Sequence, residues 1–181
     1  VDAVAKSVAD GYSFVTVANS FAANQTLVKK LPYDTLKDLR PVALMGMSEH
    51  VLATHPGSGL KKLSDLKGKK VAHTSPSSNS GNLAPRVLFP DLGLTPDTDY
   101  KPMMSGGHDK SILGVSSGDY EMAAVASDVF DRMITRGTVK KDEFRIIYRS
   151  ATFPTSSFAY AHDLKPELAA KLQQCFYSFR F

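Results

Sequence analysis

Short apolar segments alternate with amphipathic segments along most of this 181-residue chain. Strands that alternate with helical segments are typical of an α/β fold with largely parallel sheets. We therefore predict an α/β chain and find no internal repeat in it. Strands are expected at residues 12–18, 40–54, 70–75, 120–126 and 144–148, and helices at residues 25–30, 63–66, 80–89, 108–117 and 128–136.

Both ends of the sequence lie within predicted helices. Residues 1–8 repeat Val and Ala at helical spacing before Asp10-Gly11, and residues 166–181 form an amphipathic pattern with no Gly or Pro after it. We therefore expect a fold that is incomplete at both termini. No apolar run approaches the roughly 18 residues that a membrane-spanning helix needs.

The charged residues are spread along the chain. The net charge is +4, and Lys and Arg occur singly or in pairs, without the basic stripe that nucleic-acid binding requires. No nucleic-acid partner is expected, whereas a positive background favours an anionic solute. The single Cys175 cannot form an internal disulfide, and no Cys/His cluster has the spacing of a zinc site. We expect neither a metal nor a cofactor.

The most informative segment is the Ser-rich run at residues 75–81, between an apolar strand and a predicted helix. The first N–H groups of a helix have no partner within the helix and carry the positive end of its dipole. Ser78, Asn79 and Ser80 could add side-chain donors to such an anion site. The alternative is ordinary N-capping, which needs only one of these residues.

Two further candidate residues follow other strands. His108 lies in the Gly-rich turn of residues 105–109, where an imidazole could donate to an anion, and Asp128 follows the strand at 120–126. Ligands of open α/β sheets bind at the carboxyl ends of strands. The alternatives are a capping or surface histidine and a carboxylate that interacts with a helix dipole.

An enzymatic function is not expected. Ser78, His108 and Asp128 could on paper supply a nucleophile, a base and an orienting carboxylate, but the sequence has no Gly-x-Ser-x-Gly elbow around the serine. The Ser-rich run also lacks the Gly-Lys-Ser/Thr of a nucleotide-binding P-loop. We therefore predict no catalytic residues in this chain.

Residues 67–179 resemble the phosphonate-binding proteins of ABC importers through LKGKKVAHTSPSSNSGNLAPRVLF, SGGHDKSILGVSSGDYEMAAVASDVFDRM and FRIIYRSATFPTSSFAY. In that family the matching positions surround the phosphonate group, which implies that Ser78, Asn79, Ser80, His108 and Asp128 bind the ligand here. Asn79 stands where the family usually has Thr, so phosphite, phosphate and arsenic oxyanions stay possible ligands.

Residues 9–51 are instead similar to receptors of tripartite tricarboxylate transporters, through ADGYSFVTVANSFAANQTLVKKLPYDTLKDLRPVALMG. This resemblance implies ligand contacts from Asn19 and Ser20. Both families have a two-lobed type II periplasmic-binding-protein fold, whose lobes are joined by crossing strands. The resemblance implies a partial first lobe at residues 1–54, a second lobe at 55–156 and a return to the first lobe at 157–181.

The function implied by the resemblance is that of an extracytoplasmic solute-binding protein. It would act as a monomer without enzymatic activity, close around a small oxyanion, most simply a phosphonate, and deliver it to a cognate membrane permease. Its location would be the periplasm or a lipid anchor outside the cytoplasm. The alternatives are a carboxylate-binding receptor of a tripartite tricarboxylate transporter and a ligand-sensing module of the same fold.

Overall fold

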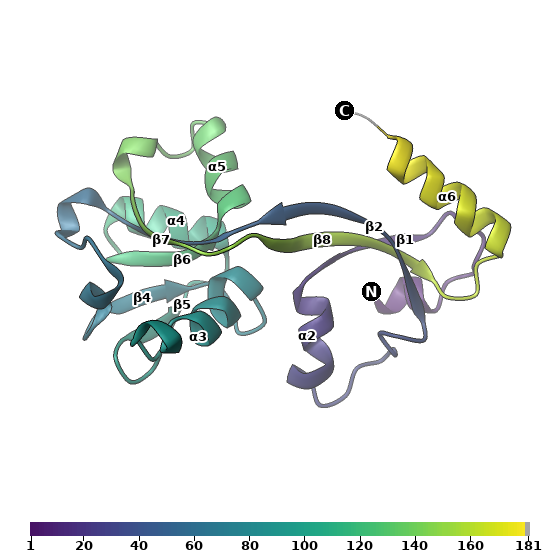
Figure 1. Ribbon diagram of the computed structural model, residues 1–181, viewed down its shortest axis with the longest axis horizontal. Helices are drawn as coiled ribbons and strands as arrows, with labels where there is room; N and C mark the ends of the chain where they lie inside the picture. The colour runs from purple at the N-terminus through teal and green to yellow at the C-terminus, as the bar shows by residue number, and fades with distance from the viewer. Residues whose placement is uncertain (180–181) are drawn as a thin grey trace. The chain divides into compact units, whose positions relative to one another are not determined.

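The computed structural model describes residues 1–179 and divides the chain into two compact units (Figure 1). The first unit contains residues 1–47 and the segment from residue 154 onward, and the second unit is Ser48–Phe153. The chain therefore leaves the first unit once and returns to it once. These boundaries lie a few residues before positions 54 and 156, the limits expected from the sequence.

The second unit is built on a five-stranded sheet with the order β5-β4-β6-β3-β7. β4 is parallel to β5 and β6, whereas β3 is antiparallel to both β6 and β7. The expectation of largely parallel strands thus fails at β3, whose two neighbours in the sheet, β6 and β7, both run antiparallel to it. The strands are β3 (His50–Thr54), β4 (Lys70–His73), β5 (Lys101–Met104), β6 (Met122–Ala126) and β7 (Arg145–Arg149).

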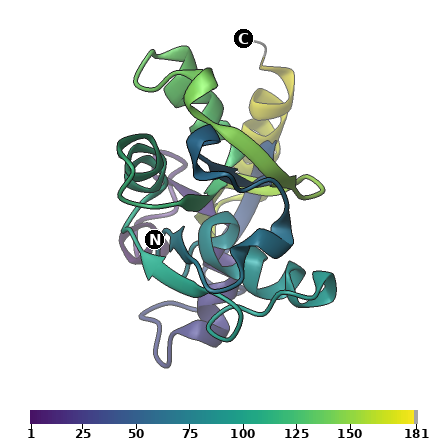
Figure 2. The same cartoon turned by 90° about the vertical axis from the view of Figure 1, so that its left-hand side faces the viewer.

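Helices cover both faces of this sheet (Figures 1 and 2). Alternate residues of a strand point to opposite faces, and Val51 and Val125 accordingly pack in one core cluster while Leu52 and Ala124 pack in another. The first cluster includes residues of α4 and α5, and the second includes Phe89 after α3. The helical segments are η1 (Pro56–Ser58), η2 (Leu63–Leu66), η3 (Asn79–Leu83), α3 (Ala84–Leu88), η4 (Pro90–Leu92), α4 (His108–Ser117), α5 (Ser127–Thr135) and η5 (Lys141–Glu143).

The first unit has a three-stranded sheet with the order β1-β8-β2. β1 and β8 are antiparallel, with Phe14 opposite Tyr160. Leu168, Leu172 and Phe176 of the C-terminal helix pack against the core of this unit. The elements are α1 (Asp2–Ala5), β1 (Phe14–Ala18), α2 (Ser20–Leu27), β2 (Leu39–Ser48), β8 (Phe153–Ala161) and α6 (Pro166–Ser178).

Several predicted elements have different limits in the structure. The helix expected at residues 25–30 begins earlier, as α2 (Ser20–Leu27), because the polar segment before it contains no Gly or Pro and Phe21 stacks on Tyr33. The continuous strand expected at 40–54 is divided at Glu49 into β2 and β3. β5 and β8 were not predicted as strands.

The helix expected at residues 80–89 is also divided. The structure has the π-helical turn η3 (Asn79–Leu83) followed by α3 (Ala84–Leu88). Pro85 provides a physical reason, since proline has no N–H to continue the regular α-helical hydrogen bonding. No helix in the described part of the chain is long and apolar enough to span a membrane.

Candidate functional site

Three turns that follow parallel strands carry most of the predicted site residues. β4, β5 and β6 run in the same direction, so their carboxyl ends meet at one edge of the sheet. The N–H of Ser105, after β5, donates to the carbonyl of His73 at 2.7 Å, and the N–H of Gly106 donates to the carbonyl of Thr74 at 2.7 Å. These bonds join the turn after β5 to the turn after β4.

The turn after β4, residues 75–83, is called the serine turn below. Ser78 is the N-cap of η3, and its hydroxyl oxygen accepts a hydrogen bond from the N–H of Gly81 at 3.2 Å. Asn79 and Ser80 follow in the first turn, where N–H groups have no partner within the helix. Ser80 is buried, and its hydroxyl has no hydrogen-bond partner among the described residues. The turn therefore presents several donors together.

His108 lies at the first position of α4 and is held in one tautomer. The N–H of Ala126, at the end of β6, donates to His108 Nδ1 at 3.1 Å. An Nδ1 that accepts a hydrogen bond carries no proton, so in the neutral ring the proton lies on Nε2. His108 Nε2 is 3.4 Å from Ser78 Oγ. The imidazole thus directs its N–H toward the serine turn.

The surroundings of His108 favour the neutral ring. Burial lowers the pKa of His108 below its usual value, although the charges of Asp128 and Asp109 act in the opposite direction. A neutral imidazole is therefore the main form near neutral pH. It can donate one hydrogen bond from Nε2 to a ligand.

The same tautomer opposes nucleophilic catalysis by Ser78. A serine nucleophile needs a neighbouring imidazole nitrogen that can accept its proton. Here the nitrogen near Ser78 carries a proton, and the other nitrogen, Nδ1, is occupied by the N–H of Ala126 rather than by the carboxylate of Asp128. The arrangement of Ser78, His108 and Asp128 is suited to donating hydrogen bonds and not to removing the proton of the serine.

Asp128 lies in the first turn of α5, where a carboxylate interacts favourably with the helix dipole. One of its oxygens accepts a hydrogen bond from the hydroxyl of Ser48 at 2.8 Å, and the other is 3.7 Å from the guanidinium of Arg132. The carboxylate is half exposed. Its charge is partly balanced by Arg132, and its oxygens can still accept a hydrogen bond from solvent or a ligand.

The second unit therefore contains five of the seven predicted site residues: Ser78, Asn79, Ser80, His108 and Asp128. Ser78 and His108 lie within contact distance of each other. Asn19 and Ser20 belong to the first unit, where Asn19 follows β1 and Ser20 begins α2. Asn19 lines a hollow of about 490 Å³ in that unit. Binding by these seven residues stays a prediction.

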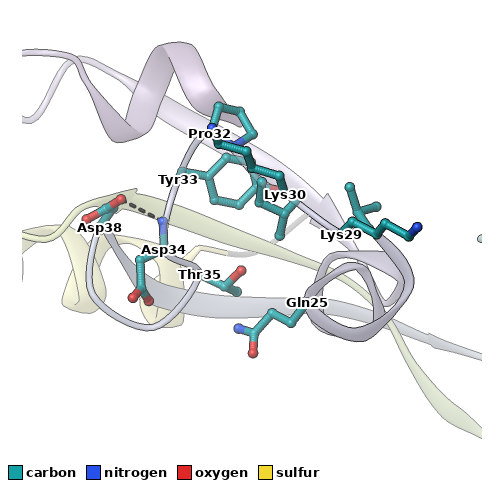
Figure 3. A pocket seen from close by; sticks show the side chains of 10 residues that line it. Gln25, Lys29, Lys30, Pro32, Tyr33, Asp34, Thr35 and Asp38 are labelled. Atoms are coloured by element: carbon teal, nitrogen blue, oxygen red, sulfur yellow. Dashed lines mark hydrogen bonds between the residues drawn. The ribbon is translucent and has the colours of Figure 1, made fainter.

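A second hollow of the first unit, of about 600 Å³, contains none of the predicted site residues. Figure 3 shows Lys29, Lys30 and Tyr33 around it, and the N–H of Asp34 donates to a carboxylate oxygen of Asp38 at 2.7 Å. The carboxylate of Asp34 accepts hydrogen bonds from neighbouring backbone N–H groups. These bonds close the loop on itself, so its carboxylates serve local structure.

Two buried histidines that were not predicted as site residues contact the serine turn. His50 Nδ1 is 2.6 Å from the carbonyl oxygen of Ser80, and His73 Nδ1 is 2.9 Å from the side-chain oxygen of Asn82. His73 Nε2 is 3.1 Å from the hydroxyl of Tyr100. In the sequence these residues stand out only by their position in apolar strand segments: His50 begins the segment 50–54, and His73 ends the segment 70–73.

No group of three or more possible metal-ligating side chains is found in the part of the chain that the structure describes. The polar groups that meet at the sheet edge are mainly N–H and O–H donors. Such a set is suited to an oxyanion, since each ligand oxygen can accept from a fixed donor.

The sequence profile described as "ABC transporter, phosphonate, periplasmic substrate-binding protein" matches residues 5–180. The chain belongs to this family. The family match confirms the resemblance stated for the second part of the chain and extends it through the first part. Membership of this phosphonate-binding family places the chain among periplasmic substrate-binding proteins of ABC transporters.

Two curated relatives match parts of the chain. The phosphate-import protein PhnD of Mycolicibacterium smegmatis is 29% identical over 144 residues, which are 72% of this chain and 43% of that protein. Protein BugT of Bordetella pertussis is 40% identical over 67 residues, or 36% of this chain and 21% of that protein. The chain spans less than half the length of these two relatives.

The fold is shared with solved structures of periplasmic binding proteins. PhnD1 of Prochlorococcus marinus, solved in complex with methylphosphonate, superposes with a TM-score of 0.71 at 16% identity, over 89% of this chain and 62% of that chain. This likeness confirms the predicted α/β periplasmic-binding-protein fold. The partial coverage agrees with the expectation that the fold is incomplete.

Proposed function

We propose that the site of the second unit binds a small oxyanion, most simply a phosphonate, phosphate or phosphite, as part of a periplasmic receptor without enzymatic activity. The observation that carries the proposal is the fixed Nε2–H of His108 beside the serine turn. A neutral imidazole N–H needs no counter-charge, and the bond from Ala126 to Nδ1 fixes the direction in which it points. The whole protein would deliver the anion to a membrane permease of the ABC class.

The donors of the serine turn support an anion of tetrahedral shape. The hydroxyl oxygen of Ser78 already accepts a hydrogen bond from the N–H of Gly81, so the hydroxyl hydrogen of Ser78 is available to a ligand. Ser80 adds a hydroxyl without a partner among the described residues, and the first-turn N–H groups add more. Several donors from one turn can bind several oxygens of one group.

Asp128 has a separate role in this proposal. A carboxylate repels a fully ionised anion, so Asp128 is expected to accept a hydrogen bond from a protonated phosphonate oxygen or from an ammonium group of the ligand. The ion pair with Arg132 reduces the repulsion. The variant Asp128→Asn should therefore lower the affinity for 2-aminoethylphosphonate more than the affinity for methylphosphonate. Equal effects on both ligands contradict the ammonium role.

The test of the proposal is calorimetric titration with methylphosphonate, phosphate, phosphite and citrate. Removal of the donor in His108→Ala should lower the affinity for the bound oxyanion at least about tenfold, since a charge-assisted hydrogen bond contributes roughly 1.5 to 3 kcal/mol. A change at the exposed His162, His162→Ala, is the matched control and should leave binding unchanged. Unaltered binding in His108→Ala contradicts the site.

A carboxylate-binding receptor is the second candidate, because residues 9–51 resemble the receptors of tripartite tricarboxylate transporters. The donors of Ser78 and Ser80 could equally bind a carboxylate. Competition between methylphosphonate and citrate separates the two candidates. Displacement of citrate by methylphosphonate at similar concentration favours the phosphonate receptor, whereas binding of citrate alone favours the carboxylate receptor.

A further inference from the structure

The carbonyl of Ser80, in the serine turn, lacks a backbone hydrogen-bond donor because of a proline in the sequence. In η3 the hydrogen bonds connect residues five apart, since the N–H of Leu83 donates to Ser78 and the N–H of Ala84 donates to Asn79. In this π-helical pattern the next donor, to the carbonyl of Ser80, would be the N–H of residue 85. Residue 85 is Pro, which has no N–H.

The carbonyls of Gly81 and Ser80 have different kinds of hydrogen-bond partner. The partner of the Gly81 carbonyl is a backbone N–H, and the partner of the Ser80 carbonyl is a side chain. The carbonyl of Gly81 accepts from the N–H of Thr74 at 3.1 Å. The carbonyl of Ser80 is 2.6 Å from His50 Nδ1. A carbonyl oxygen can only accept, so His50 Nδ1 carries the proton and donates it. His50 therefore replaces the backbone donor that Pro85 removes.

The His50 side chain is buried and held in place by its neighbours. Its side chain is fully buried, with 0% of its surface exposed, and its ring lies 5.5 Å from the ring of Phe89 and 5.7 Å from that of Tyr148 between centroids. His50 Nε2 has no hydrogen-bond partner among the described residues. The ring is therefore fixed by its aromatic neighbours and by a single hydrogen bond to Ser80.

We propose that His50 is a positioning residue of the serine turn, whose Nδ1–H holds the carbonyl of Ser80 so that the N–H and hydroxyl of Ser80 keep their direction toward the ligand. This inference rests on the proposed anion-binding function. His50 acts through Ser80 and donates its only ring proton to protein. The physical reason is that a buried carbonyl without a partner favours a rearranged turn.

The deciding experiment is a double-mutant cycle between His50 and Pro85. His50→Leu removes the side-chain donor and should lower the affinity for methylphosphonate about tenfold in calorimetry. Pro85→Ala supplies an N–H at residue 85, which can donate to the carbonyl of Ser80. In the Pro85→Ala background the same His50→Leu change should lower the affinity less than about threefold. Equal losses in both backgrounds overturn the proposal.

A conservative variant separates positioning from packing. His50→Gln keeps an N–H donor and should retain more affinity than His50→Leu, although both lose the imidazole ring. Thermal unfolding of each variant checks that it is folded before its affinity is compared. If His50→Leu is unfolded, His50→Phe, which also lacks a donor but keeps an aromatic ring, replaces it in the cycle with Pro85→Ala. Equal affinity of folded Gln and Leu variants contradicts a role for the donor.

A measurement without ligand distinguishes failure of this inference from failure of the proposed function. The ¹⁵N shifts of the His50 ring in the whole chain should show a neutral imidazole with the proton on Nδ1. A proton on Nε2 overturns the positioning role even if phosphonate binds. If Nδ1 carries the proton but no tested oxyanion binds the native chain, the proposed function fails while the contact of His50 with Ser80 is retained.

Discussion

At the scale of single residues, the close approach of Gly81 to Thr74 shows how tightly the serine turn is packed against the end of β4. The carbonyl of Gly81 accepts from the N–H of Thr74, and a Cβ added at Gly81 would overlap Oγ1 and Cγ2 of the Thr74 side chain. Thr74 is itself buried and has little freedom to move. Glycine is required at position 81 because the Thr74 side chain leaves no room for a Cβ atom.

The variant Gly81→Ala should therefore lower the free energy of unfolding by about 2 kcal/mol, the usual cost of forcing extra atoms into a packed site. It should also weaken oxyanion binding, since the N–H of Gly81 donates to the hydroxyl of Ser78. Urea denaturation gives the first quantity and calorimetry the second. The control is Gly46→Ala, where the nearest atom, Thr155 Oγ1, is 3.4 Å from the added Cβ. Equal effects of both changes contradict the steric argument.

At the scale of elements, α4 presents His108 at its first residue and ends at Gly118. Gly118 has a φ of 88°, in the left-handed region, and its N–H donates to the carbonyl of Val115. Glycine adopts this conformation without the steric cost of a Cβ. The end of the helix is thus set by backbone conformation, because no atom lies within 4 Å of a Cβ added at Gly118.

Gly118→Ala should lower the free energy of unfolding by about 1 kcal/mol, the cost of placing an ordinary residue in the left-handed region. Gly118→Asn is the matched comparison and should cost less, because asparagine tolerates this region better. Both are measured by urea denaturation. Since Gly118 lies at the opposite end of α4 from His108, oxyanion affinity should be unchanged in both variants. A larger loss in the Asn variant contradicts this explanation.

At the scale of the whole molecule, the two units differ in how they are built. Ser48–Phe153 is continuous in sequence and contains two large buried clusters, whereas the first unit is formed from two separate segments around a smaller buried cluster. A continuous segment with its own core meets the usual requirements for independent folding.

We expect residues 48–153, expressed alone, to fold and to unfold cooperatively in urea. The fragment contains Ser78, His108 and Asp128 together with the elements that position them. Near-ultraviolet circular dichroism and a single denaturation transition check this prediction. A fragment that retains secondary structure but shows no cooperative transition would show that its core depends on the first unit.

The stability of the whole chain should also depend on pH through its buried histidines. Burial lowers the pKa of His50 from 6.5 to about 4, and burial lowers the pKa of His73 and His108 as well. Each of these rings binds a proton more readily in the unfolded chain than in the folded one. Stability is therefore complete above the unfolded pKa of 6.5 and is lost as the pH falls toward the lower folded values.

The free energy of unfolding should fall by about 2 kcal/mol or more between about pH 7 and about pH 5. The measurement stays above pH 5, because Asp34, Asp65 and Glu143 have lowered pKa values and affect stability only in more acidic solution. His50→Gln should reduce the slope. A free energy that is constant over this range contradicts the buried, neutral state of these histidines.

The sequence by itself determined the α/β class, the family and most of the helices and strands. It also predicted the serine turn and His108 as parts of an anion site, because Ser, Asn and Gly between a strand and a helix form a local signal. Alternating hydrophobicity and helix-start residues act over a few positions, so they can be recognised without knowing the fold. α4 begins and ends at the residues that its pattern predicted.

Only the tertiary structure decided which partners surround these residues. The antiparallel direction of β3, the contact of His50 with Ser80 and the bond from Ala126 to His108 Nδ1 join positions far apart in sequence. The π-helical turn before Pro85 depends on such contacts, since a distant side chain satisfies its carbonyl. A hydrogen bond between remote segments leaves no local pattern, because either partner alone is compatible with many environments.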